Sequence, residues 1–460
     1  MKKRLSVLTV LLVVGLLTGF SVSTIRATGS RTTGVVVQNL GDEAATVRLD
    51  YYNQAGNTVA YTETVVQPAS AVGFGANNQA GLTDGFVGSL VVSADQPIAA
   101  IGNDTDNDSV GFYSAVTEGA TKLYVPALYK GYGNWLSEIW IQAVEQVPTG
   151  ATATITFRDR SGNQTGTAKT VNLTTYATIK VSPSDYADIA ANWAGGAVIE
   201  SSYKMGAVIR NTRDTGATGM IAEEYNAFAT GDTQVFVPAI YKKYGAWNSN
   251  GINVQNLGTQ TTTVSIDFYN RDGLLVTTYN FADAFAANGG VQAVNTKNIT
   301  ELADGFAGTA VIRSTGVSLQ PVIGIVDVTS TDQGKGNVYN AVLASDAAST
   351  VYLPSQYKRF GGWRSGVIAM NLGATPVQIT IEFYARGATT PSATASATVN
   401  QYIAFAKNTL NTDLLLDDGW SGTAVVRAPA GSSIVVVGNV DGGFPTRTGL
   451  AGMYNAFPKK

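Results

Sequence analysis

Three segments of the chain share one spacing of aromatic side chains around a proline and a lysine. They cover residues 124–135, 236–247 and 352–363 and follow the pattern V/L-P-x-x-Y-K-x-Y/F-G-x-W. Aromatic rings in such a segment either pack the joint between two domains, which we favour, or stack on sugar rings with Lys130, Lys242 or Lys358 beside them. The candidate interface or glycan-contact residues are Tyr129, Tyr132, Trp135, Tyr241, Tyr244, Trp247, Tyr357, Phe360 and Trp363.

A second group that could do chemistry is a run of alternating carboxylates. Asp104, Asp106 and Asp108 have the oxygen-rich spacing that Ca²⁺ prefers. The run lacks the glycine and the distal glutamate of an EF-hand loop, so a solvated turn is the competing interpretation. Calcium is the only metal that the sequence suggests, and no other cofactor is expected.

The composition excludes much of catalysis. The chain has 460 residues and contains no Cys and no His. Thiol catalysis, histidine-based triads, His/Cys zinc sites and disulfides are therefore absent. Glycosidase chemistry needs only two carboxylates, but acids such as Asp50, Asp267 and Glu382 fall on outward strand positions. We expect no enzymatic activity.

The first 27 residues have the pattern of a secretory leader. Lys2, Lys3 and Arg4 precede an apolar stretch, and small residues allow cleavage after Ala27 or, alternatively, after Ser23. Cleavage after Ala27 leaves 26 basic against 33 acidic side chains, a net charge of −7, which disfavours nucleic acid. The sequence predicts a secreted, extracellular or cell-surface protein with no membrane-spanning segment in the mature chain.

The remaining chain consists of four copies of one unit. A strand ending in Gln-Asn-Leu-Gly or a variant of it begins near Val35, Ile139, Ile252 and Val367. An aromatic-x-Gly pair and a Tyr-x-Ala marker follow in the same order in each copy. Unit 2 departs from the pattern, with Ala-Val-Glu in place of Asn-Leu-Gly. The predicted domains are 28–120, 121–232, 233–348 and 349–460.

Within each unit the hydrophobic pattern has the period of a half-buried strand. Val47, Leu49 and Tyr51 alternate with polar residues, and turn signals separate about seven short strands per unit. We expect an all-β protein of four tandem immunoglobulin-like β-sandwich domains forming an elongated chain. In the aromatic-x-Gly marker, the aromatic side chain should fill the core between the sheets, and the glycine should let a neighbouring backbone segment pass close by or form a bulge. The Asn of Asn-Leu-Gly should satisfy backbone groups where the strand turns. Prolines 126, 238 and 354 suit an edge strand or a crossing between domains.

The connector and the following V-x-x-Q-N-x-G strand resemble uncharacterised tandem β-sandwich repeats in secreted proteins of some filamentous bacteria. The resemblance covers nearly the whole mature chain and implies an extracellular or cell-surface repeat protein, without an activity.

There are three connectors for four units, and unit 1 begins without one. This count suggests head-to-tail self-assembly into a filament or surface layer, with residues 28–33 adding a strand to a neighbouring copy. The alternative is a repeat adhesin that binds cell-surface or extracellular polysaccharide through the connector aromatics.

Overall fold

The computed structural model describes residues 18–26, 31–106, 109–216, 219–330, 334–442 and 450–459, with side chains from Ile25 onward. Within these ranges the chain forms β-strands, turns and short 3₁₀ segments without an α-helix, which confirms the all-β prediction. Over the same residues no helix has the length and apolar character needed to span a bilayer.

The strands fall into four units that follow one another along the chain. Unit 1 contains β1 (Thr18–Arg26), β2 (Thr32–Asn39), β3 (Ala45–Asn53), β4 (Thr58–Val66), β5 (Ala71–Gly75), β6 (Val87–Ala94), β7 (Ile98–Thr105) and β8 (Val110–Ser114). Unit 2 contains β9 (Ala120–Lys130), β10 (Trp135–Ala143), β11 (Thr152–Asp159), β12 (Lys169–Asn172), β13 (Thr178–Val181), β14 (Trp193–Asp214) and β15 (Met220–Asn226).

Units 3 and 4 repeat this order. Unit 3 contains β16 (Gln234–Lys242), β17 (Asn248–Asn256), β18 (Val264–Asn270), β19 (Leu275–Asn280), β20 (Val291–Val294), β21 (Phe306–Ser314), β22 (Val322–Ser330), β23 (Lys335–Asn340) and β24 (Val342–Leu343). Unit 4 contains β25 (Thr350–Phe360), β26 (Trp363–Asn371), β27 (Val377–Ala385), β28 (Ala393–Val399), β29 (Ala404–Asn408), β30 (Trp420–Arg427), β31 (Ile434–Gly442), β32 (Ala451–Asn455) and β33 (Phe457–Pro458).

The strands pair antiparallel, in two separate sheets in units 1 and 3 and in one continuous sheet in each of units 2 and 4. In unit 1 the sheets have the orders β1-β6-β3-β4 and β5-β2-β7-β8, and unit 3 repeats them as β19-β18-β21-β16-β24 and β20-β17-β22-β23. In unit 2 the long strand β14 makes the sheet continuous, since its first half pairs with β9 and β11 and its second half with β10 and β15. The predicted alternation holds, because Val47, Leu49 and Tyr51 are buried in β3.

The repeated glycine of the aromatic-x-Gly marker is required by a close backbone approach. A Cβ built on Gly88, Gly195, Gly308 or Gly422 would lie 2.1, 2.0, 2.0 or 1.8 Å from a carbonyl oxygen of the neighbouring strand. No side chain larger than hydrogen fits at such distances, which confirms the expected role of the glycine. Of the aromatics, Trp193 is buried in the core, whereas Phe86, Phe306 and Trp420 are half-buried against it.

The repeated asparagine satisfies the backbone at a turn, as expected. Asn39 Nδ2 donates to the carbonyls of Glu43 and Val66, and its Oδ1 accepts from Gly41 N at 2.8 Å. Asn256 and Asn371 make the equivalent contacts in units 3 and 4. Each of these side chains therefore fixes the end of a strand in its own unit.

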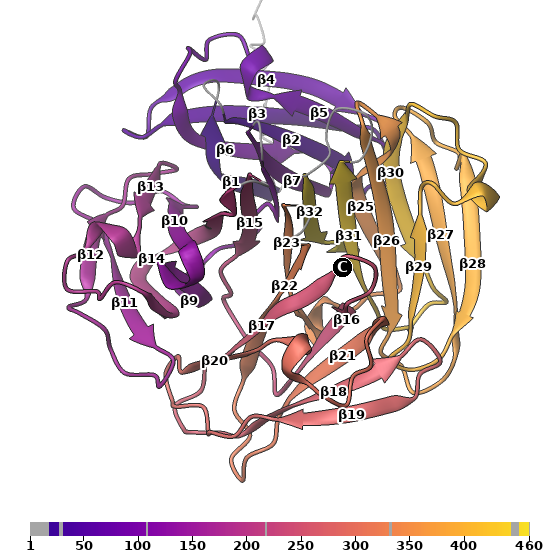
Figure 1. The fold of residues 1–460 in the computed structure, drawn as a ribbon. Helices are drawn as coiled ribbons and strands as arrows, with labels where there is room; N and C mark the ends of the chain where they lie inside the picture. The colour runs from indigo at the N-terminus through magenta and orange to yellow at the C-terminus, as the bar shows by residue number, and fades with distance from the viewer. Residues whose placement is uncertain are drawn as a thin grey trace, which may run out of the picture.

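The four units form a closed ring, and the expectation of an elongated chain is wrong (Figure 1). Each unit has one strand that carries the tyrosine of the Tyr-x-Ala marker. These four strands, β8, β15, β23 and β32, contact one another in a cycle at the centre of the ring. Asn226 Nδ2 donates to Ser114 O (2.7 Å), Asn340 Nδ2 to Asn226 O (2.9 Å), Asn455 Nδ2 to Asn340 O (2.7 Å), and Ser114 Oγ to Asn455 O (3.0 Å). One residue from each unit thus completes a hydrogen-bonded ring around the central axis.

The hydrophobic cores follow the same cyclic order. The core of unit 4 includes Val36, Leu40 and Ile101 of unit 1. The core of unit 3 likewise includes residues of unit 4, and that of unit 2 includes residues of unit 3. Each unit therefore buries its sandwich against the next one, and the fourth closes on the first.

Unit 1 also has a strand in the connector position, although only three copies of the motif exist, so the inference that unit 1 lacks a connector is wrong. In the other units the connector strand lies opposite the aromatic-x-Gly glycine, with Leu128, Ile240 or Gln356 as its partner and a register shift at the preceding proline. In unit 1, Ile25 of β1 lies opposite Gly88 after a register shift at the same place.

The segment 22–26 is thus the fourth connector, in a form without the proline and the aromatics of the motif. A leader cut after Ala27 would remove β1 entirely, and a cut after Ser23 would remove residues 18–23 of it.

Candidate ligand-binding clefts at the unit junctions

The connector aromatics form a stacked pair in each of units 2, 3 and 4. We call Tyr129, Tyr241 and Tyr357 the inner rings and Tyr132, Tyr244 and Phe360 the outer rings. The ring centroids are 6.4, 5.7 and 6.1 Å apart, with interplanar angles of 17°, 18° and 14°. Parallel rings at this separation form a favourable offset stack.

A tight turn produces this geometry. After each outer ring a glycine, Gly133, Gly245 or Gly361, has a φ of +56°, in the left-handed region that favours glycine. The turn brings the following tryptophan back beside the pair, and Trp135 lies 6.0 Å from Tyr129. The Y-x-x-Y/F-G-x-W spacing of the motif is thus the spacing of one compact aromatic group.

An arginine that the sequence analysis did not select completes each group. The guanidinium carbons of Arg160, Arg271 and Arg386 lie 4.8, 4.8 and 5.5 Å from the centroid of the outer ring of the same unit. Each arginine follows a buried core phenylalanine by three residues. This recurrence is a signal that could have identified the arginines from the sequence.

The group of unit 2 lines a cleft of about 500 Å³ at the junction with unit 3, which we call the 2–3 cleft. Unit 3 contributes asparagines and a lysine to the opposite wall, and Asp327 is the only carboxylate among the described lining residues. The lining is mostly polar: Tyr129, Tyr132, Trp135, Arg160, Arg213, Asn250, Asn253, Asn295, Lys297, Asn298, Asp327 and Thr329.

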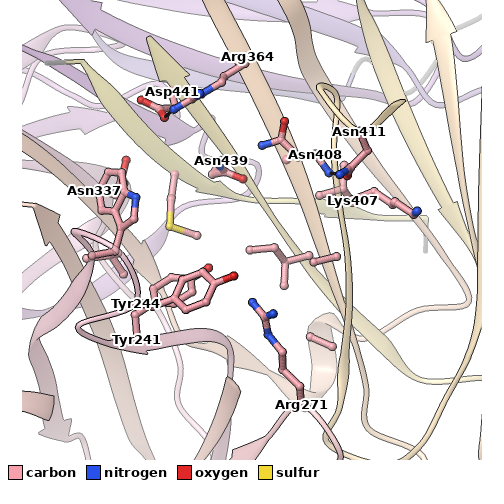
Figure 2. A pocket seen from close by; sticks show the side chains of 18 residues that line it. Tyr241, Tyr244, Arg271, Asn337, Arg364, Lys407, Asn408, Asn411, Asn439 and Asp441 are labelled. Carbon is pink, nitrogen blue, oxygen red and sulfur yellow. Dashed lines mark hydrogen bonds and ion pairs between the residues drawn. The ribbon is translucent and has the colours of Figure 1, made fainter. Parts of the chain in front are cut away.

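The group of unit 3 lines an equivalent cleft of about 680 Å³ at the junction with unit 4, the 3–4 cleft. Figure 2 shows Tyr241 and Tyr244 on one side, with the guanidinium of Arg271 pointing into the cleft from below them. Asn408 and Asn439 lie on the opposite side, and Asp441 is held by Lys335 at 2.8 Å and by Arg364.

The inner rings fit the interpretation of the motif as junction packing, and the outer rings are exposed as the ligand-binding interpretation requires. The inner rings are largely covered at the junction, and burial raises the pKa of Tyr241 to about 12 and that of Tyr129 further above its usual range. The outer rings Tyr132, Tyr244 and Phe360 are 43%, 39% and 42% exposed. The same motif therefore packs the junction and presents aromatic surface to solvent.

The connector lysines do not belong to the clefts, contrary to expectation. Lys130 Nζ donates to the carbonyls of Tyr186 and Ile189 at 2.8 Å, and Lys242 Nζ donates to Ile299 O at 2.7 Å. Lys358 makes the equivalent bond to Leu416. Because their side chains fold into their own unit and satisfy backbone carbonyls there, they are structural residues.

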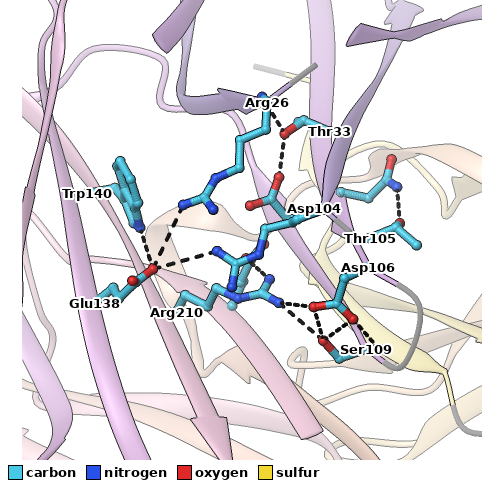
Figure 3. Close-up of polar contacts among 12 residues, drawn as sticks. Arg26, Thr33, Asp104, Thr105, Asp106, Ser109, Glu138, Trp140 and Arg210 are labelled. Atoms are coloured by element: carbon cyan, nitrogen blue, oxygen red, sulfur yellow. Dashed lines mark hydrogen bonds and ion pairs between the residues drawn. The ribbon is translucent and has the colours of Figure 1, made fainter. Parts of the chain in front are cut away.

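The junction between units 1 and 2 holds a cluster of charged side chains, the 1–2 charged cluster, where the other junctions have an aromatic group (Figure 3). Arg26 occupies the place of the inner ring and lies over Trp140 at 4.8 Å. Glu138 lies 3.9 Å from Arg26 and 3.7 Å from Arg31, and accepts a hydrogen bond from the Trp140 indole at 3.2 Å. Charge pairing here replaces the aromatic contacts of the other junctions.

Two of the three proposed calcium ligands, Asp104 and Asp106, belong to the 1–2 charged cluster. Asp104 accepts a hydrogen bond from the Thr33 hydroxyl, and Asp106 lies 3.4 Å from the buried Arg210 and accepts bonds from Ser109. Asp108 lies outside the described residues. Among those described, no group of three or more carboxylates gathers at one place. The carboxylates of Asp104 and Asp106 thus have protein partners of their own.

A buried carboxyl pair lies at the base of the 2–3 cleft, between Glu223 of β15 and Asp327 of β22. Burial and the proximity of Asp327 raise the pKa of Glu223 well above its usual range, and burial raises that of Asp327 to about 6. Neither Glu223 Oε1 nor Asp327 Oδ1 has a donor within the described part of the chain. The pair is stable when one proton is shared between the two groups.

No family model matches the chain, and no curated protein matches it. Among solved structures, Thermotoga maritima 1070 is matched with 13% identity and a TM-score of 0.21, over 25% of this chain and 97% of that one. The RrgB pilus protein of Streptococcus pneumoniae is matched with 11% identity and a TM-score of 0.14, over 74% and 68%. A glycoside hydrolase family 32 structure from Bifidobacterium adolescentis is matched with 10% identity and a TM-score of 0.16, over 96% of both chains. At these scores the likenesses carry neither fold nor function to this chain.

Proposed function

We propose that the protein is a secreted or cell-surface protein that binds glycans through the clefts between its units. The observation that supports this most strongly is the recurrence, at three of four junctions, of an exposed outer ring flanked by a tryptophan and an arginine. A structural need alone is met without this group at the junction of units 1 and 2. The aromatic groups therefore call for a role beyond holding the ring together.

The composition of the clefts suits a polyhydroxylated ligand. Amide and guanidinium groups supply donors and acceptors for hydroxyls, and aromatic surface packs against the apolar faces of sugar rings. The 2–3 cleft has four asparagines in its lining, Asn250, Asn253, Asn295 and Asn298. The 3–4 cleft also has four, Asn337, Asn408, Asn411 and Asn439.

The ring also bears on the competing hypothesis of head-to-tail assembly. That hypothesis started from an unmatched unit 1, whereas β1 fills the connector position and unit 4 packs against unit 1. Because the two ends that were to join copies meet within one molecule, the premise no longer supports assembly.

Binding without catalysis is proposed because each cleft has one carboxylate in its described lining, Asp327 or Asp441. Glycoside hydrolysis by two carboxyl groups needs a second one about 5 to 10 Å away across the scissile bond. Glu223 contacts Asp327 directly and is buried behind it. The arrangement can store a proton at the base of the cleft.

A glycan-binding screen of the purified protein tests the proposal. The double variant Tyr132→Ala, Tyr244→Ala removes two outer rings, and Tyr61→Ala removes a ring that is 60% exposed on unit 1. We expect bound glycans to be lost by the double variant and retained by the Tyr61 variant. Equal loss in both variants, or no glycan bound by the native chain, would refute it. Electron microscopy of the same sample should show dispersed rings, whereas regular fibres would favour assembly.

A further inference from the structure

We infer that the glycan taken by the clefts is acidic and that its carboxylate, as in a uronic acid residue, is bound by the arginine over the outer ring. This inference rests on the proposed glycan binding and names the class of sugar. The residues that carry it are Arg160, Arg271 and Arg386.

These three arginines have no carboxylate partner among the described residues. Arg271 points into the 3–4 cleft, and no carboxylate lies within 4.0 Å of it among the residues that the structure describes. The other two cations that line this cleft are paired, Lys407 with Asp413 and Arg364 with Asp441. Arg160 likewise has no carboxylate partner in the described 2–3 cleft. A guanidinium keeps five donors in a fixed fork, which match a carboxylate in two parallel hydrogen bonds.

The neighbouring unit leaves room for the arginine. Gly73, Ala293 and Ala406 occupy one equivalent position on β5, β20 and β29, opposite Val36, Asn253 and Ile368. A Cβ at Gly73 would be in ordinary van der Waals contact with Arg386, 3.6 Å from a terminal nitrogen, so a side chain longer than alanine would reach into the space of the guanidinium. The chain therefore keeps a small side chain wherever an arginine crosses the junction.

The fourth junction shows that these features occur together. Unit 1 has Arg26 in place of the inner ring and Gln54 at the position of the cleft arginine, three residues after Tyr51. On the facing strand of unit 2 the small residue is replaced by Lys180, which lies 3.5 Å from Glu138. Aromatic pair, arginine and small residue are present together at three junctions and absent together at one, as expected for parts of one site.

The linings of the 2–3 and 3–4 clefts carry more positive than negative side chains. Each of the two clefts is lined by three cationic side chains and a single carboxylate, in a protein whose net charge is −3. In the 2–3 cleft these are Arg160, Arg213 and Lys297 against Asp327, and the proton shared with Glu223 reduces the negative charge further. A local excess of positive charge in an acidic protein attracts anionic ligands and repels cationic ones.

Recognition then divides into two parts. The exposed aromatic surface packs against a sugar ring, and the adjacent guanidinium binds the ring's carboxylate. The 2–3 and 3–4 clefts lie on one ring, so a polysaccharide can engage both, which raises the apparent affinity without new contacts.

The test compares a polyuronate with its uncharged methyl ester and with a polymer that carries sulfate in place of carboxylate. Binding of the full-length protein to polygalacturonate, to the same polymer fully methyl-esterified, and to dextran sulfate is measured by calorimetry at about 0.15 M salt. We expect polygalacturonate to bind at least about tenfold more tightly than either of the others. Equal affinity for the esterified polymer would overturn the carboxylate assignment while leaving glycan binding in place. Equal affinity for dextran sulfate would reduce it to general charge attraction and overturn it as well. Failure to bind any member of a wider glycan panel would instead refute the proposed function.

Variants locate the site. The triple variant Arg160→Gln, Arg271→Gln, Arg386→Gln should bind polygalacturonate at least about tenfold more weakly and lose its preference over the ester. The corresponding lysine variants keep the charge but not the fork and should fall between the two. Arg48→Gln is the matched control. The Arg48 guanidinium lies 4.4 Å from the centroid of the Tyr61 ring, and Arg48 does not line the 2–3 cleft or the 3–4 cleft. Unchanged preference in a triple variant that keeps its melting temperature would overturn the inference.

Discussion

The hydroxyl of Tyr352 in unit 4 donates a hydrogen bond to the carbonyl oxygen of Leu40 in unit 1, at 3.4 Å and across 312 residues of chain. Tyr124 of unit 2 makes the same contact with Leu257 of unit 3, also at 3.4 Å. One contact joins consecutive units and the other joins the ends of the chain. The equivalence of the two shows that the ring closes by the interface that it uses between neighbours.

The position of β1 predicts that residues 18–26 are needed for the stability of unit 1. A chain beginning at Thr18 should unfold at a higher temperature than one beginning at Thr28, because the second lacks a strand between β6 and solvent. Ile25→Ala in the longer chain should cost about 2–4 kcal/mol, since Ile25 is 1% exposed. Thermal and urea unfolding measure both effects. Equal stability of the two chains would show that β1 is dispensable.

The same comparison bears on processing of the leader. Mass spectrometry of the exported protein gives the first residue of the mature chain. A start before Thr18 agrees with a ring that retains β1. A start at Thr28 combined with full stability would contradict the assignment of residues 22–26 as the fourth connector.

The carboxyl pair predicts a specific dependence of stability on pH. The pKa of Asp327 is about 6 when folded and near 3.8 in an unfolded chain, so the folded state holds more protons between these values. Stability from this group is therefore complete below about pH 4 and is lost as the pH rises through 6. Asp327→Asn should leave stability nearly unchanged at pH 4 and raise it by about 1–3 kcal/mol at pH 8.

Two references make this measurement specific. Asp304→Asn alters a pair in which both side chains are more than half exposed, and it should give no such pH-dependent gain. Burial raises the pKa of Glu224 to about 7, so this residue also makes stability fall as the pH rises. That contribution is the same in the native protein and in the Asp327→Asn variant and cancels in their comparison. An Asp327→Asn variant with the native pH profile would show that the two carboxyl groups do not share a proton.

The close approach at the marker glycine predicts strong destabilisation by a single methyl group. Gly422→Ala should lower the free energy of unfolding by about 3 kcal/mol or more, because the new Cβ would lie 1.8 Å from the Tyr384 carbonyl oxygen. Gly75→Ala is the control, since its Cβ would have Asn78 Nδ2 at 3.5 Å as its nearest neighbour and its φ is −103°. A Gly422 variant as stable as the Gly75 variant would mean that the strands are further apart than described.

The elements within a unit could be predicted from the sequence because their causes are local. The alternation of Val47, Leu49 and Tyr51 specifies a strand with one buried face, and Asn39 bonds to backbone groups close in sequence or on the adjacent turn. The compact grouping of the connector aromatics is local for the same reason, since their spacing matches one tight turn, but which junction they line could not be read from the sequence.

Ring closure could not be predicted, because it depends on the angle between units, which no short pattern encodes. The fourth connector could not be recognised from the motif because Arg26 occupies the position of the tyrosine. Arg26 contributes to the junction of units 1 and 2 through its ion pair with Glu138. The Glu223–Asp327 pair was missed because two units bring together residues more than 100 positions apart. Neither residue has a local pattern that marks it.

We expect glycans to bind where the outer ring, the tryptophan and the arginine converge. A crystal of the full chain soaked with a trimer of galacturonic acid tests it most directly. We predict a sugar ring against Tyr244 and Trp247, with its carboxylate in contact with the Arg271 guanidinium. Empty 2–3 and 3–4 clefts at a concentration that saturates binding in solution, or a trimer bound elsewhere on the ring, would contradict the account.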